Sequence, residues 1–91
     1  MTDEDRLAER AGDREDRYLQ ALTKARNEAE KVYDLETIAK LEKLYEETID
    51  KIEGIDNKRR QKVVKSQIWA LEQEIGVYSE AIEKVRVLVV K

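Results

Sequence analysis

The chain has 91 residues, 43% of them charged and 41% hydrophobic, with a formal net charge of −3 and no proline, histidine, cysteine or phenylalanine. Without histidine or cysteine it lacks the commonest general base, the commonest metal ligand and the best free nucleophile, so we expect no enzyme, no metal and no other cofactor. The 18 basic and 21 acidic residues nearly balance, which disfavours a nucleic-acid partner.

The first residues of the chain predict a short helix over about 3–11. Thr2 and Asp5 have the spacing of a capping box, in which each side chain bonds the backbone of the other residue. Gly12 is expected to end this helix as a left-handed residue, and Asp13 is expected to cap the next helix.

Two stripes of apolar residues follow, and each has the alternating spacing of three and four that marks one face of a helix. The first stripe lies in residues 14–33 and the second in 35–53. On one continuous helix the two stripes would face nearly opposite sides, so we place a break at Tyr33 and Asp34, with Asp34 as an N-cap. The alternative is a single long helix, because no glycine or proline marks the break.

Gly54 and Asp56 predict a further boundary, with Gly54 ending one helix and Asp56 capping the next. The segment 57–90 carries a longer stripe, wide enough to contact more than one neighbouring helix. Its unbroken spacing predicts one helix, whereas Gly76 predicts a turn that divides it in two.

The residues after Gly76 resemble the turn and second helix of a tetratricopeptide repeat, where an aromatic residue and then Glu-Ala-Ile follow the glycine. Here these are Tyr78 and residues 80–82. Further apolar positions of that repeat are matched by Ile68, Val85 and Leu88. Trp69 stands where the family has a small residue, and the closing proline is absent. The resemblance covers about a third of the chain and implies a local helical hairpin, not a repeat array.

We therefore expect an all-α fold in one domain over residues 1–91. The main prediction is a compact bundle of about five helices, built from stacked antiparallel helical hairpins. The alternative is a bundle of three longer helices.

Two residues are candidates for an interaction surface. Trp69 lies well off the apolar stripe of its helix, and Val87 points the same way if that helix is continuous. An exposed tryptophan can anchor a partner, but another helix of the same chain can equally cover it, and we favour that cover. With only these two residues left over, the chain is expected to be a monomer, and helix-mediated self-association is the alternative.

The remaining polar clusters are interpreted as solvated helix surfaces. The basic residues 58–60, with Lys62 and Lys65, are expected at the start of a helix rather than in a nucleic-acid site. The carboxylates are expected to pair with bases one turn away, as in Glu36 with Lys40 and Glu47 with Lys51. The hydroxyls of four tyrosines are expected at the edge of the core: Tyr18, Tyr33, Tyr45 and Tyr78.

Two hypotheses for function follow. The first is a designed helical scaffold with no biochemical activity, because helix caps and amphipathic stripes agree across the chain. The second is a natural helical interaction or oligomerisation module that binds a helix in a groove. The longest apolar run, 87–90, is too short to span a bilayer, so we expect no membrane partner. A soluble protein is expected, cytoplasmic if it is natural, but the compartment is not specified by the sequence.

Overall fold

The computed structural model describes residues 2–61 and 66–89, which form three helices with no strand among them. These are α1 (Asp3–Lys31), α2 (Leu35–Arg60) and α3 (Gln67–Val89). The predicted all-α fold is confirmed in its alternative form of three longer helices. The main prediction of about five helices is wrong, because the expected turns at three glycines lie inside helices. No helix in the described part of the chain has both the length and the apolar character needed to cross a membrane.

Helix α1 begins where the capping box predicts. The Asp5 N–H donates to Thr2 Oγ1 at 3.2 Å, and the Thr2 N–H donates to an Asp5 carboxylate oxygen at 3.3 Å. The helix then continues through Gly12, contrary to the prediction. Its buried positions Ala11 and Tyr18 continue one face past the glycine, and packing of that face outweighs the cost of about 1 kcal/mol for a helical glycine.

The predicted break between α1 and α2 is confirmed. Tyr33 adopts a left-handed conformation with φ of 54°, and the Asp34 N–H donates to the Ala29 carbonyl at 2.9 Å, which closes the end of α1. The Asp34 carboxylate then caps α2 by accepting bonds from the Thr37 N–H at 3.2 Å and the Thr37 hydroxyl at 2.7 Å. The switch of the apolar stripe to the opposite side after residue 33 therefore predicted this turn correctly, although no glycine marks it.

The other predicted turns are corrected. Gly54 and Asp56 lie within α2, and Gly76 lies within α3, so the hairpin turn that the tetratricopeptide resemblance implies at Gly76 is not formed. No glycine in the described chain has a positive φ. Glycine permits a turn but does not require one, and the unbroken stripe of α3 was the better guide.

The basic residues predicted at a helix start lie instead in the last turn of α2. Lys58, Arg59 and Arg60 there face the negative end of the helix dipole, where cations are favourable. Beyond Gln61, the predictions that involve residues 62–65 lie outside the described residues. The Ser66 hydroxyl accepts a bond from the Trp69 N–H at 3.2 Å and so caps α3.

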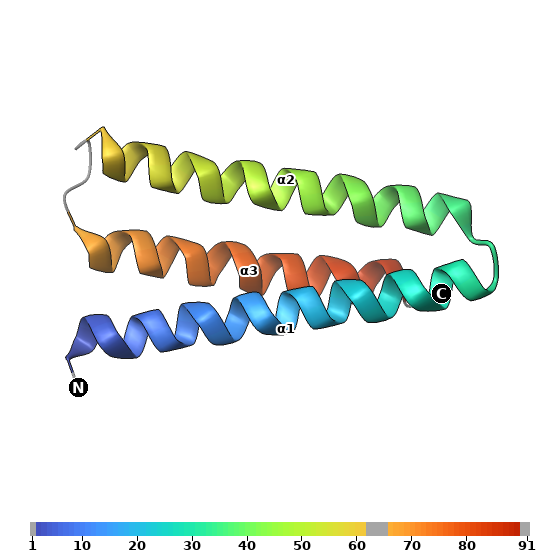
Figure 1. Cartoon of the computed structure of the whole chain (residues 1–91), viewed down its shortest axis with the longest axis horizontal. Coiled ribbons are helices and arrows are strands. Elements are labelled where there is room, and N and C mark those ends of the chain that lie inside the picture. Colours follow the sequence, from blue (N-terminus) through green and yellow to red (C-terminus); the bar gives the residue numbers. More distant parts are fainter. Residues whose placement is uncertain (1, 62–65, 90–91) are drawn as a thin grey trace.

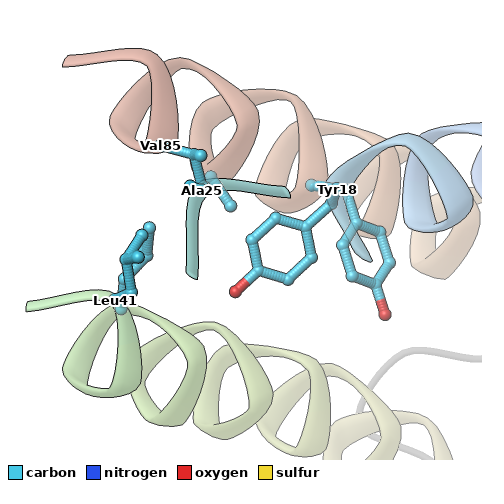
Figure 2. Close-up of a cluster of buried hydrophobic side chains, with 7 residues drawn as sticks. Tyr18, Ala25, Leu41 and Val85 are labelled. Atoms are coloured by element: carbon cyan, nitrogen blue, oxygen red, sulfur yellow. The ribbon is translucent and has the colours of Figure 1, made fainter. Parts of the chain in front are cut away.

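Helices α1 and α3 run parallel to each other, and α2 runs antiparallel to both (Figure 1). The contact between α1 and α3 is the most extensive, and the contact between α1 and α2 is the least. Small buried residues on α1 and α3 let these two helices approach closely: Ala11, Ala25, Ala29, Ala70 and Ala81. Helix α2 contributes larger side chains to the shared core, including Leu41 and Leu44, which pack with Tyr18 and Val85 (Figure 2).

The bundle is elongated, with extents of 46 × 28 × 16 Å. Its radius of gyration is 15.0 Å, whereas a compact domain of this length has a value of about 12 Å. The chain exposes 6538 Å², about 1,000 Å² more than a compact monomer of the same mass. Several large apolar side chains are exposed as well, and the most exposed are Val32, Tyr33, Leu35 and Val87.

Candidate interaction surface

The two residues singled out from the sequence lie on the same side of α3 but are not brought together. About five helical turns separate Trp69 from Val87, which places them roughly 27 Å apart along the helix axis. Trp69 is half-buried, whereas Val87 is 73% exposed. Only Val87 therefore belongs to an open apolar surface.

Val87 lines a groove between α2 and α3. With Leu44 and Leu88 it forms an apolar floor, and the groove has a volume of about 450 Å³. Leu44 is buried and Leu88 is half-buried, so the exposure of the floor rises from Leu44 through Leu88 to Val87. We call this the α2–α3 groove; its rim consists of the charged residues Lys40, Lys43, Glu47, Glu80, Glu83 and Lys84.

The antiparallel course of α2 and α3 sets the order of these charges. Lys40 and Lys43 come from the part of α2 nearer its N-terminus, where α3 contributes Val87. Further along α2, Glu47 lies opposite Glu80, and the two line a narrow continuation of the groove. Along α2 the rim therefore changes from Lys40 and Lys43 to Glu47 over about 10 Å, which is two helical turns, whereas α3 contributes charges of both signs.

Some rim charges are paired along their own helix. Lys40 meets Glu36 at 3.0 Å, as predicted, and Lys84 meets Glu80 at 3.3 Å. The predicted pair of Glu47 with Lys51 is absent from the ion pairs of the described residues. All these side chains are substantially exposed, and such surface pairs contribute only about 0–1 kcal/mol each. The rim is therefore free to exchange its internal pairs for pairs with a partner.

A second polar cluster lies away from the groove, around the hydroxyl of Tyr78. Glu15, Asp56 and Glu74, one from each helix, lie near enough to Tyr78 to affect its ionisation. Burial, helped by these negative charges, raises the pKa of Tyr78 to about 12. Burial also raises the pKa of Glu74, and nearby Asp56 adds to the rise while Arg59 opposes it.

This carboxylate cluster does not form a metal site. In residues 2–61 and 66–89, no group of three or more acidic side chains has the geometry to hold a metal ion. Arg59 lies beside the cluster and bonds both the Asp56 carboxylate, at 3.5 Å, and Gln67 at the start of α3. The cluster therefore joins the ends of α2 and α3 electrostatically.

Tyr18 and Tyr33 differ from the prediction that the tyrosine hydroxyls lie at the core edge, whereas Tyr45, 42% exposed, agrees with it. Tyr18 is fully buried, and its hydroxyl has no hydrogen-bond partner among the described residues. Burial raises the pKa of Tyr18, although the nearby Thr48 moderates the rise. The Thr48 hydroxyl donates to the Leu44 carbonyl at 2.7 Å, so its proton is not directed at Tyr18. Tyr33, in contrast, is 86% exposed.

Sequence reasoning did not identify the α2 half of the groove. The sequence feature that could have revealed this half is Leu44, which lies beside the apolar stripe of α2, between Lys43 and Glu47 of opposite charge. This feature forms part of a groove only because α2 packs beside α3, and that packing is a tertiary contact that the local sequence does not specify. Comparisons with protein-family models, with curated proteins and with solved structures find no match to this chain.

Proposed function

We propose that the chain is a helical interaction module that binds an amphipathic helix in the α2–α3 groove. The observation that carries this proposal is the groove itself, where an exposed valine and two leucines form an apolar floor between charged rims. An apolar floor with polar edges is the arrangement by which proteins bind the apolar face of a helix. Catalysis has no part in this proposal, because the binding requires only burial and charge.

The hypothesis of a designed scaffold is the second candidate. It is supported by the side-chain caps of all three helices, which Thr2, Asp34 and Ser66 supply. Local capping that agrees with the global fold is typical of idealised sequences. The exposed Val87 favours the interaction module, because a self-contained scaffold has no need of an exposed apolar side chain in a groove.

The proposal is tested with a fluorescently labelled synthetic helix that carries leucines at i, i+3, i+4 and i+7 and mixed charges elsewhere. We expect its fluorescence anisotropy to rise on addition of the chain. Val87→Lys should weaken binding about tenfold, because it places a charge on the apolar floor. Val32→Lys is the matched control, since Val32 is 68% exposed but lies outside the groove.

The peptide should bind Val32→Lys as it binds the unaltered chain. A peptide of the same composition without the apolar stripe should bind neither. The proposal is overturned if the striped peptide fails to bind, or if both valine variants bind it equally. Failure to bind any helix would leave the scaffold as the better hypothesis.

A further inference from the structure

We propose that a second copy of this chain covers the α2–α3 groove. Two copies associate face to face about a two-fold axis that crosses the groove near Leu44, so that each α2 lies antiparallel to the other α2. This inference rests on the proposed function, because it names the partner of the same groove.

The charge order of the α2 rim is complementary to itself. In the antiparallel arrangement the lysine end of one α2 rim lies over the glutamate end of the other. Lys43 of each copy then faces Glu47 of the other, and Glu83 faces Lys84 close to the axis. A two-fold axis repeats every contact, so each such pair occurs twice.

Lys43 and Glu47 are the rim residues best suited to such pairs. Both are exposed, and neither makes an ion pair within residues 2–61 and 66–89. The charged neighbours Lys84 and Glu83 are paired along α3, with Glu80 and Arg86 respectively. A two-fold axis along the helices would instead place α2 of one copy over α3 of the other, so Lys43 and Glu47 would no longer face each other.

The face along the helices is large enough for such an interface. The bundle is elongated, with extents of 46 × 28 × 16 Å, and a standard interface buries about 800 Å² on each partner. Facing the two grooves covers Val87 and Leu88 of both copies, and so removes from water the most exposed apolar side chain of α3. Burial drives this association, and the rim charges select its direction.

The experiment is sedimentation equilibrium of the unaltered chain and of two charge-reversal variants over a wide concentration range. The unaltered chain should dimerise. Lys43→Glu and Glu47→Lys should each dimerise about tenfold or more weakly, because each places like charges opposite one another twice. An equimolar mixture of the two variants should associate as tightly as the unaltered chain, since the two glutamates at positions 43 and 47 of one variant would then face the two lysines at positions 47 and 43 of the other.

Each variant changes only the α2 rim, where positions 43 and 47 then carry the same charge. Lys24→Glu and Glu28→Lys are the matched controls, because they reverse an exposed lysine and glutamate with the same spacing on α1. Both controls should dimerise like the unaltered chain.

Each outcome decides the inference. A chain that stays monomeric at all concentrations overturns it, while the peptide experiment independently tests whether the groove binds a helix. A dimer that neither variant weakens overturns the groove as the interface. Weakened variants that fail to associate when mixed overturn the antiparallel arrangement, because only complementary facing charges predict the rescue.

Discussion

Gly76 is an exposed glycine in the interior of α3, and it shows how little a single residue decides when packing is strong. Its φ is not positive, and a Cβ added there would meet no atom within 4 Å. Gly76→Ala should therefore stabilise the protein by about 0.5–1 kcal/mol, the difference in helix propensity. Thermal and urea unfolding would measure this change. A destabilised variant would contradict a continuous α3.

Tyr18 is the residue whose polar atom is least well satisfied. Its hydroxyl is buried and forms no hydrogen bond with the described residues, which leaves a desolvation cost of about 1–3 kcal/mol uncompensated. Tyr18→Phe keeps the ring that contacts Tyr78 and removes that cost, so the free energy of unfolding should stay level or rise by about 1 kcal/mol. Tyr78→Phe is the control. A large loss of stability in Tyr18→Phe would mean that the hydroxyl makes a bond.

At the scale of the helices, the α1–α2 turn stores strain at one position. Tyr33 has a left-handed φ, which costs a residue with a Cβ about 1–2 kcal/mol, and its side chain is almost wholly exposed. Tyr33→Gly should therefore stabilise the chain by about 0.5–1 kcal/mol after the extra entropy of glycine in the unfolded state. Tyr33→Ala keeps the strain and should give no such gain, as chemical unfolding would reveal.

The carboxylate cluster around Tyr78, which includes Glu74, makes the stability of the bundle depend on pH. The pKa of Glu74 is raised above 4.5, so the folded state holds this proton more tightly than the unfolded state does. The stability it contributes is present below pH 4.5 and is lost as the pH rises through the higher folded pKa.

Glu74→Gln should remove this dependence. At neutral pH the variant should be more stable by at most about 1 kcal/mol, because the group is partly exposed and solvent screens it. Unfolding measured from acid to neutral pH should show a flatter profile for the variant. An unchanged profile would mean that the carboxylate is ordinary. Glu72→Gln, an exposed residue on the same helix, is the control.

The helix boundaries show which sequence signals carry information. Capping at Thr2 and the change of apolar face at Asp34 were read correctly, because both depend on contacts within one turn or on the direction of burial. The turns at Gly12 and Gly54 were wrong, because glycine lowers helix propensity by an amount that packing along α1 and α2 exceeds. The boundary before α3 was missed, although Ser66 has the character of an N-cap.

At the scale of the molecule, the groove was only half predictable. Val87 was identified because it lies off the stripe of α3, but Leu44 and the rim of α2 were not. Which residues of α2 lie beside Val87 depends on the relative placement of two helices, and this is decided by close contact through alanines elsewhere in the bundle. Trp69 was grouped with Val87 by direction alone, whereas the length of α3 separates them.

Association of two copies should couple to folding of the whole chain. If the dimer binds only folded protein, mass action raises the melting temperature as the concentration increases, by about 3 °C for each tenfold step in a domain of this size. Lys43→Glu should melt at a temperature that varies less with concentration, since its grooves repel. Circular dichroism over three decades of concentration would measure both slopes. Equal slopes of melting temperature against concentration in the two proteins would mean that the groove is not the interface. The other exposed apolar surface, at Val32, Tyr33 and Leu35, would then be the next candidate.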